Sequence, residues 1–119
     1  MIAGVGVDVV DLARFERAIT RAPRLLTRLF TESERGLPAH SLAARFAAKE
    51  AVIKALGRPD LVTAIDVEVV SDEHGNPGLS LHGRVGEVAA ERGILRWHLT
   101  MTHDAGVACA FVVAETSDR

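Results

Sequence analysis

The sequence is poor in the features that mark secreted, membrane-spanning and nucleic-acid-binding proteins. It contains one cysteine, Cys109, so it cannot form an internal disulfide or a cysteine-based zinc cluster, and a reducing compartment is indicated. Its 14 Lys and Arg residues stand against 16 Asp and Glu residues, and the net charge of -2 argues against general nucleic-acid binding. There is no basic signal segment and no apolar run near the roughly 20 residues of a membrane helix. We therefore expect a soluble, cytoplasmic protein.

The 119 residues, 48% of them apolar and 25% charged, predict one globular domain over residues 1–119. Apolar periodicity and turn-forming residues predict one strand, several helices, a hairpin, a helix and a second hairpin. The expected strands are 2–10, 65–70, 79–82, 95–102 and 107–114, and the expected helices are 11–22, 24–30, 41–57 and 83–92. Strands joined by tight turns are antiparallel. The fold class is therefore α+β, with an antiparallel sheet packed against helices.

The expected helix 41–57 carries charged residues within a mostly apolar stretch. Ser41 is a suitable N-cap, and Gly57 supplies the left-handed residue that commonly ends a helix. At 3.6 residues per turn, Glu50 and Lys54 project from the same side as Phe46. The plain interpretation is a solvated Glu50–Lys54 pair that stabilises the helix by about 0.3–0.5 kcal/mol.

Asp8 favours a functional interpretation of the same helix. It interrupts an apolar strand of the buried type, where a carboxylate is costly unless it is paired or binds a metal. It could instead cap the following helix, although Asp11 is better placed for that. Asp8 and Glu50 together form an oxygen-only ligand set that suits Mg²⁺, and Lys54 would then face substrate phosphates. Arg45 and His103 are two further candidates for donating hydrogen bonds to the substrate phosphates.

Basic residues recur every three or four positions near the N-terminus. An unbroken helix axis through Pro23 would gather them into one stripe, which is either a solvated face or a docking surface for an acidic partner. The residues are Arg14, Arg17, Arg21, Arg24 and Arg28. Directly after them, Thr31 and Glu34 have the spacing of a capping box, which predicts another short helix.

Four motifs occur together and in order. They are Gly-Val-Gly-Val-Asp-Val-Val-Asp-Leu-Ala-Arg-Phe (4–15), Arg-Phe-Ala-Ala-Lys-Glu-Ala-x-x-Lys-Ala-Leu-Gly (45–57), Gly-Asn-Pro-x-Leu-x-Leu-x-Gly (75–83) and Trp-His-Leu-Thr-Met-Thr-His-Asp (97–104). With them the chain closely resembles the short, single-domain holo-[acyl-carrier-protein] synthase family of 4′-phosphopantetheinyl transferases. The resemblance covers nearly the whole chain.

The resemblance implies a reaction and a set of site residues. The family transfers the 4′-phosphopantetheine arm of coenzyme A to a serine of apo acyl carrier protein, and releases adenosine 3′,5′-bisphosphate. Asp8 and Glu50 match its magnesium ligands, and Lys54 matches its pyrophosphate-contacting lysine. The implied coenzyme A contacts are Arg45, Phe46, Lys54, Gly57, Thr102 and His103. Arg14 matches a carrier-docking arginine, and Arg17, Arg21 and Arg24 extend the predicted docking surface.

The resemblance also implies a homotrimer whose active sites are shared between subunits. Glu50, or a water that it holds with the metal, would take the serine proton. Two other functions are compatible with the residues: a non-catalytic docking module that uses the arginines, and another magnesium-dependent enzyme acting on a phosphorylated nucleotide, such as a pyrophosphatase.

Overall fold

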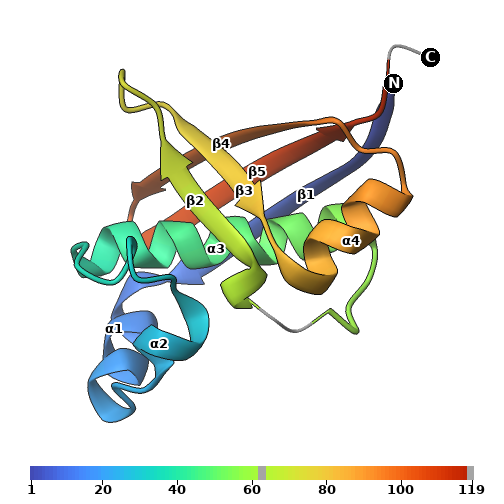
Figure 1. The fold of residues 1–119 in the computed structure, drawn as a ribbon. Helices are drawn as coiled ribbons and strands as arrows, with labels where there is room; N and C mark the ends of the chain where they lie inside the picture. Colours follow the sequence, from blue (N-terminus) through green and yellow to red (C-terminus); the bar gives the residue numbers. More distant parts are fainter. Residues whose placement is uncertain (62–63, 118–119) are drawn as a thin grey trace.

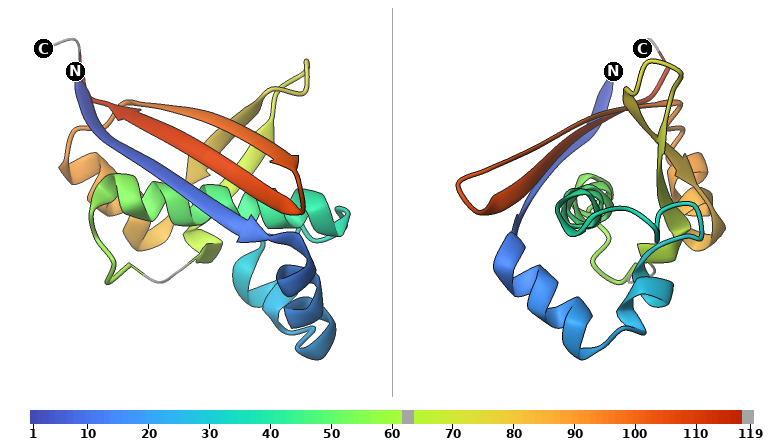
Figure 2. Two further views of the ribbon diagram at one scale, coloured as in Figure 1. Left: turned by 180° about the vertical axis from the view of Figure 1, so that it is seen from behind. Right: turned by 90° about the vertical axis from the view of Figure 1, so that its left-hand side faces the viewer.

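A long helix passes between two antiparallel sheets in the computed structural model, which describes residues 1–61 and 64–117 (Figures 1 and 2). The elements in order are β1 (Ile2–Asp11), α1 (Leu12–Arg21), α2 (Leu25–Leu29), α3 (Ala39–Leu56), the 3₁₀ turn η1 (Ala64–Asp66), β2 (Val67–Ser71), β3 (Pro77–Leu81), α4 (Gly83–Glu91), β4 (Arg96–Asp104) and β5 (Val107–Glu115). Helices α1 and α2 lie near one end of α3, and α4 lies near the other (Figure 1). This arrangement confirms the predicted α+β class.

The larger sheet has the strand order β1-β5-β4, and the smaller sheet pairs β2 with β3. All pairings are antiparallel, and β5 is the central strand that its apolar sequence predicted. In the register of the larger sheet, Asp8 lies opposite Ala110, and Ala110 lies opposite Met101. This register places the predicted metal ligand Asp8 about two-thirds of the way along β1, on the side that faces α3.

Small residues let α3 pack closely against the larger sheet. An ideal Cβ atom placed on Gly6 would lie 1.9 Å from the carbonyl oxygen of Ala51, and one on Gly4 would lie 2.1 Å from that of Ala55. Opposite them, the helix and β5 present mainly buried alanines: Ala47, Ala48, Ala51, Ala55, Ala108, Ala110 and Ala114. Because α3 is covered on several sides by both sheets, its apolar residues surround the helix instead of forming one stripe.

One expectation about the larger sheet was wrong, because the outer face of β1 is exposed. The apolar sequence of β1 predicted a strand buried on both faces, but β1 lies at the sheet edge and only its inner face packs on α3. The outward side chains of Val5, Val7 and Val9 are 54%, 49% and 59% exposed, and Phe111 on β5 is 43% exposed. Leu95, which directly precedes β4, is also exposed.

The helix ends agree with the sequence at some positions and differ at others. Asp11 caps α1 as predicted, because its Oδ1 accepts a hydrogen bond of 2.8 Å from the Arg14 amide. Gly57 ends α3 with φ of 64°. However, α3 begins at Ala39 after Pro38, so the prediction that Ser41 is the N-cap was wrong. Pro38, with φ of -61°, occupies the N-cap position three residues before Ser41.

One prediction in the first half of the chain is confirmed and another is wrong. Helix α1 ends at Arg21 and α2 begins at Leu25, which confirms the separate helices predicted on either side of Pro23 and excludes one continuous helical stripe of arginines. Residues 32–36 form turns and not the short helix predicted from Thr31 and Glu34. Within the described ranges, no helix is long and apolar enough to span a membrane.

Candidate active site

A cavity of about 410 Å³ opens where β1 crosses the middle of α3. Its walls come from β1, α2, α3 and the segment that follows α3. The lining residues are Asp8, Leu29, Phe46, Lys49, Glu50, Ile53, Lys54, Pro59, Leu61 and Ala64. The structure therefore brings together the three residues that the sequence placed at the chemical centre, Asp8, Glu50 and Lys54, and adds Phe46, an implied coenzyme A contact.

The two carboxylates meet because strand and helix approach closely. Gly6, two residues before Asp8, lets β1 lie directly on the turn of α3 that contains Ala51 and Glu50. Burial raises the pKa of the Glu50 carboxyl above its usual range, the nearby charge of Asp8 raises it further, and Lys54 partly offsets the effect. Burial and the charge of Asp8 therefore outweigh the effect of Lys54, and both disfavour the ionised form of Glu50.

Lys54 pairs with Asp8 and not with Glu50. Its Nζ donates to Asp8 Oδ1 at 2.9 Å and to the carbonyl oxygen of Val7 at 3.0 Å. The plain interpretation of the sequence, a helical Glu50–Lys54 ion pair, is therefore wrong. Among the described residues, Glu50 forms no salt bridge within 4.0 Å. Asp8 therefore has a salt-bridge partner, whereas Glu50 has none among the described residues.

This donor set fits a magnesium ion. Across residues 1–61 and 64–117, no three His, Cys, Asp or Glu side chains gather as a metal cluster, so the protein offers two carboxylates at most. Mg²⁺ commonly binds through one or two carboxylates and fills its remaining positions with water and substrate phosphate. A cation would also relieve the repulsion between Glu50 and Asp8 that raises the pKa of Glu50.

A second cavity, of about 210 Å³, lies between the first turns of α3 and the end of β4. It is lined by His40, Ser41, Ala44, Arg45, Met101, Thr102 and His103, and so contains three of the implied coenzyme A contacts, Arg45, Thr102 and His103. The Nε atom of Arg45 is buried and has no hydrogen-bond partner among the described residues. A buried donor without a partner is uncommon in folded proteins, and it is suited to an incoming anion.

His40 belongs to this cavity but was missed from the sequence. Its ring centroid lies 4.9 Å from that of His103. The signal that could have found it is its position one turn before Ala44 and close to Arg45 on α3. That signal was lost because the helix was expected to begin at Ser41, one residue later.

Gly57 does not line either cavity, although it was predicted to contact coenzyme A. Its left-handed conformation ends α3 and turns the chain, and an added Cβ there would meet no atom within 4 Å. The residues that reach the first cavity from this region are Pro59, Leu61 and Ala64. The turn after Gly57 therefore builds the cavity wall, a role that only the folded chain reveals.

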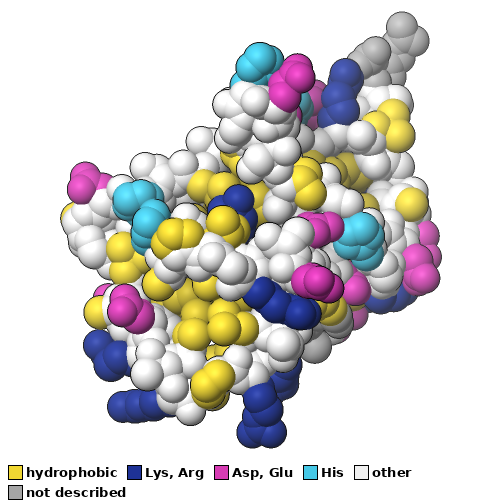
Figure 3. Space-filling view, turned by 60° about the vertical axis from the view of Figure 1, so that its left-hand side comes forward, with side chains coloured by type: hydrophobic (Ala, Val, Ile, Leu, Met, Phe, Trp, Pro, Cys, Tyr) yellow, Lys and Arg dark blue, Asp and Glu magenta, His cyan; other side chains and the backbone are white. Residues whose placement is uncertain are grey.

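The predicted docking arginines lie on α1 and at the start of α2. Arg14 lines an apolar groove of about 430 Å³ that continues from Asp8 and Phe46 along α1 and α2. Arg17 and Arg21 lie along a shallow depression on α1, and Arg24 precedes α2. Figure 3 shows Lys and Arg side chains gathered at the lower end of the molecule, with apolar surface between them. Within the described residues, none of these four guanidinium groups forms a salt bridge.

A family model described as the 4′-phosphopantetheinyl transferase superfamily matches residues 4–112. The chain belongs to this superfamily. It is 64% identical over 115 residues to a holo-[acyl-carrier-protein] synthase of Leifsonia xyli subsp. xyli, with 97% of this chain and 98% of the relative covered.

Solved transferase structures have the same fold. The holo-[acyl-carrier-protein] synthase of Neisseria meningitidis superposes with a TM-score of 0.88 at 34% identity, and covers 98% of this chain and 100% of its own. The Helicobacter pylori synthase in complex with coenzyme A superposes with a TM-score of 0.83 at 30% identity, over 93% and 99% of the two chains. The resemblance seen in the four sequence motifs is thus confirmed at the level of family and fold.

Proposed function

We propose that this protein transfers the 4′-phosphopantetheine group of coenzyme A to a serine of apo acyl carrier protein, in fatty acid or polyketide biosynthesis. The observation that carries the proposal is the meeting of Asp8, Glu50 and Lys54 in one cavity of a phosphopantetheinyl transferase fold. In the reaction, the serine oxygen attacks the phosphorus that bears the pantetheine arm. The pyrophosphate P–O bond breaks, and adenosine 3′,5′-bisphosphate leaves.

Asp8 and Glu50 would hold Mg²⁺, which neutralises negative charge on the pyrophosphate and on the leaving bisphosphate. Lys54 is 57% exposed and carries its ammonium beside Asp8, so it can reach a pyrophosphate oxygen from the cavity mouth. There it stabilises the leaving group as a point charge or donates a proton to it.

Glu50 is the best-placed proton acceptor of the chain in this cavity. Asp8 is paired with Lys54, whereas Glu50 forms no salt bridge among the described residues, so the Glu50 carboxylate is the less engaged of the two. It takes the serine proton directly or through a water that it orients. A Glu50→Gln variant that keeps metal and coenzyme A affinity but loses turnover would favour the direct role.

The second cavity would bind the phosphate at the nucleotide end of coenzyme A. Arg45 offers a buried unpaired Nε, and Thr102 and His103 face the same space. We add His40 to this set because its ring lies against that of His103. Phe46 lines the first cavity and the apolar groove beside it, so it can contact the substrate between the metal site and the carrier.

The arginines of α1 and α2 would dock the acidic carrier protein. Arg14 is the residue closest to the chemistry, because its groove shares Asp8, Leu29 and Phe46 with the reaction cavity. Arg17, Arg21 and Arg24 extend the positive surface away from the cavity. Complementary charge of this kind raises the rate of encounter and fixes the orientation of the partner.

A homotrimer is the assembly that we propose, with active sites between subunits. Val5, Val7 and Val9 form an exposed apolar row on β1, and Phe111 lies opposite Val7 on β5. Large exposed apolar patches commonly mark protein interfaces. Val7 and Val9 flank Asp8 in the chain, so a subunit covering this row would lie next to the catalytic strand. We also retain the expectation that the chain is one catalytic domain of the cytoplasm.

The proposed activity is tested by incubating the protein with apo carrier protein, coenzyme A and Mg²⁺, and measuring the intact mass of the carrier. The carrier is expected to gain one phosphopantetheine group, and omission of Mg²⁺ should abolish the gain. A protein that binds carrier but never modifies it, even at high concentration, would instead fit the docking module. Cleavage of coenzyme A to 4′-phosphopantetheine and adenosine 3′,5′-bisphosphate without carrier modification would instead fit a pyrophosphatase.

A further inference from the structure

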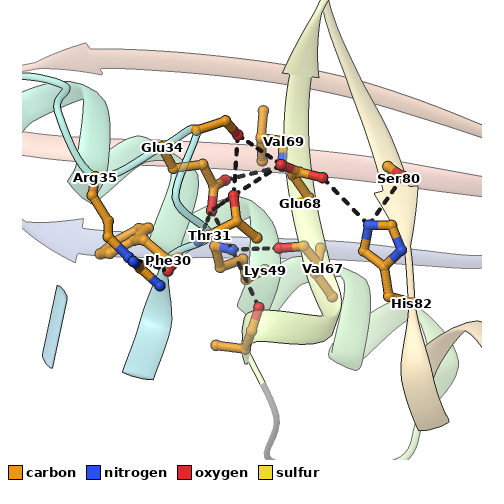
Figure 4. Close-up of polar contacts among 12 residues, drawn as sticks. Phe30, Thr31, Glu34, Arg35, Lys49, Val67, Glu68, Val69, Ser80 and His82 are labelled. Carbon is orange, nitrogen blue, oxygen red and sulfur yellow. Dashed lines mark hydrogen bonds and ion pairs between the residues drawn. The ribbon is translucent and has the colours of Figure 1, made fainter. Parts of the chain in front are cut away.

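A buried ion pair lies at the wall of the reaction cavity and takes no part in the proposed chemistry. Lys49 Nζ and Glu34 Oε1 are 2.9 Å apart, and both side chains are 1% exposed (Figure 4). These two are the only charged side chains buried to this degree in the described part of the chain. Burying two charges carries a large desolvation cost, so their retention calls for a physical reason.

The ammonium group of Lys49 has an acceptor for each of its three protons. It donates to Glu34 Oε1, to the carbonyl oxygen of Ala64 at 3.2 Å, and to the carbonyl oxygen of Val67. The Phe30 ring lies 5.4 Å from the same nitrogen. Burial lowers the pKa of Lys49, and Glu34 opposes this shift by pairing with the charged form.

Both oxygens of the Glu34 carboxylate also accept hydrogen bonds, from the turn after α2 and from β2 as well as from Lys49. Its Oε1 accepts from the Thr31 amide at 2.9 Å as well as from Lys49, and its Oε2 accepts from the Val69 amide at 3.0 Å. The pair therefore ties three segments to one point: the turn after α2, the middle of α3, and η1 with the start of β2. Segments far apart in the sequence are held at fixed distances by these directional bonds.

A second, more exposed carboxylate braces the same turn from outside. Glu68 Oε2 accepts from Thr31 Oγ1 at 2.9 Å and from Ser33 Oγ at 2.6 Å, and its Oε1 lies 3.3 Å from His82 Nε2. These hydroxyl bonds hold the pKa of the Glu68 carboxyl below its usual range. The turn after α2 is thus fastened to β2 at two points.

The segments that the pair joins are also the walls of the reaction cavity. Lys49 itself lines the cavity, Ala64 forms part of the opposite wall, and Leu29 closes the α2 side. Glu50 follows Lys49 directly on α3, so any rotation of this helical turn that released Lys49 would move the Glu50 carboxyl as well. A shift of about 1 Å at a reacting group can lower a rate by about 100-fold.

We propose that the buried Glu34–Lys49 ion pair is a positioning device for the transfer reaction, which holds Glu50 and the α2 and η1 walls in register. The proposal rests on the proposed function. Stability alone does not explain the pair, because packed apolar residues of similar volume commonly serve a fold as well as a buried ion pair does. Directional bonds to three segments specify one geometry, which apolar contacts do not.

The test compares wild type with Glu34→Gln, using Glu87→Gln as the matched control. The control makes the same chemical change in an exposed ion pair with Arg84 on α4, a helix that contributes no residue to the cavity lining. Three quantities are measured well below each melting temperature: kcat at saturating coenzyme A and carrier, KM for carrier, and the dissociation constant of Mn²⁺. Mn²⁺ serves as a directly observable probe of the Asp8–Glu50 site and does not depend on turnover.

For Glu34→Gln we expect kcat to fall about tenfold or more and Mn²⁺ binding to weaken severalfold, with KM for carrier unchanged. The control should stay within about twofold of wild type in all three. A folded Glu34→Gln protein with wild-type kcat and Mn²⁺ affinity would overturn the proposal and leave the pair a purely structural feature. Inactivity of the wild type itself would instead reject the proposed function, and the two failures are therefore distinct.

A second variant covers the case in which Glu34→Gln does not fold. Glu34→Gln combined with Lys49→Met leaves no unpaired charge in the interior, which removes the main cause of unfolding. Its kcat should still fall about tenfold, because the bonds to Ala64 and Val67 are lost. Recovery of wild-type kcat in this double variant would overturn the proposal.

Discussion

Gly6→Ala is the substitution that should disturb the site most directly, because β1 and α3 are in close contact at residue 6. A Cβ atom on residue 6 would lie 1.9 Å from the Ala51 carbonyl oxygen, 2.8 Å from its carbon and 3.0 Å from the Ala55 nitrogen. All three are backbone atoms of α3, so no side-chain rotation can relieve the clash. Strand and helix must therefore separate locally by about 1 Å.

This separation should lower both the stability of the fold and kcat. Overpacking typically costs 1–3 kcal/mol, and a clash with backbone belongs at the upper end, about 3 kcal/mol. For a domain of this size, that cost lowers the melting temperature by about 10 °C. The same movement draws Asp8 away from Glu50, because each lies within two residues of the contact. A displacement of about 1 Å in a catalytic group predicts a loss in kcat of about 100-fold.

The assay pairs thermal unfolding with carrier modification measured by intact mass, at a temperature where the variant is fully folded. Gly36→Ala is the matched control, because an added Cβ there would meet no atom within 4 Å. Gly36→Ala should have the melting temperature and the kcat of wild type. A Gly6→Ala protein that behaves in the same way as Gly36→Ala would refute the argument that this crossing sets the distance between the two carboxylates.

Three further predictions concern the metal, the carrier and the assembly. Because burial raises the pKa of Glu50, lowering the pH through that raised value should protonate it, and the half-saturating Mn²⁺ concentration should rise by about tenfold per pH unit below it. Charge reversal at Arg14 and Arg21 should raise the KM for carrier by tenfold or more while coenzyme A affinity, measured by calorimetry, stays unchanged. Replacing Val7 by Asp should convert the proposed trimer to monomer in light scattering and lower turnover with it.

Each of these predictions has an outcome that contradicts it. Mn²⁺ affinity that is flat over the same pH range would mean that Glu50 is not a ligand. Equal losses from Arg84→Glu on α4 would show that the effect of the arginine reversals is general electrostatics and not docking. A monomeric wild type, or a trimer that tolerates Val7→Asp as it tolerates Val70→Asp on β2, would exclude the apolar row on β1 as the interface.

In the apo protein, the raised pKa of Glu50 also has a consequence for stability. The folded state holds the Glu50 proton more tightly than the unfolded chain does, so this group stabilises the fold at low pH. That contribution is lost as the pH rises through the raised pKa. A bound divalent cation should reverse the trend, because it binds the ionised carboxylate of the folded state only.

The sequence predicted most elements because their signals are local. Asp11 caps α1 by a bond to an amide three residues on, and Gly57 ends α3 through its own backbone conformation. The apolar run of β5 led correctly to its central position in the sheet. Asp8 and Glu50 could be paired as candidates because a carboxylate within an apolar element is rare in itself, wherever the two elements lie.

The remaining features depend on contacts between distant segments, which local patterns do not encode. The Glu34 carboxylate does accept from the Thr31 amide as a capping box requires, but it also binds Lys49 and the Val69 amide, and no helix follows it. Lys54 pairs across to Asp8, 46 positions away, and not with its helical neighbour Glu50. The exposure of β1 could not be read from its apolar residues, because an interface strand and a core strand have the same composition.

In the proposed reaction, this chain moves phosphopantetheine from coenzyme A to a carrier protein with Asp8 and Glu50 at the metal site. The most direct test is the intact mass of apo carrier protein after incubation with coenzyme A, Mg²⁺ and either wild type or Asp8→Ala. Wild type should add one phosphopantetheine group to the carrier serine, and Asp8→Ala should add none while still binding carrier. Absence of the mass gain with wild type across several carrier proteins, or an equal gain with Asp8→Ala, would contradict the account.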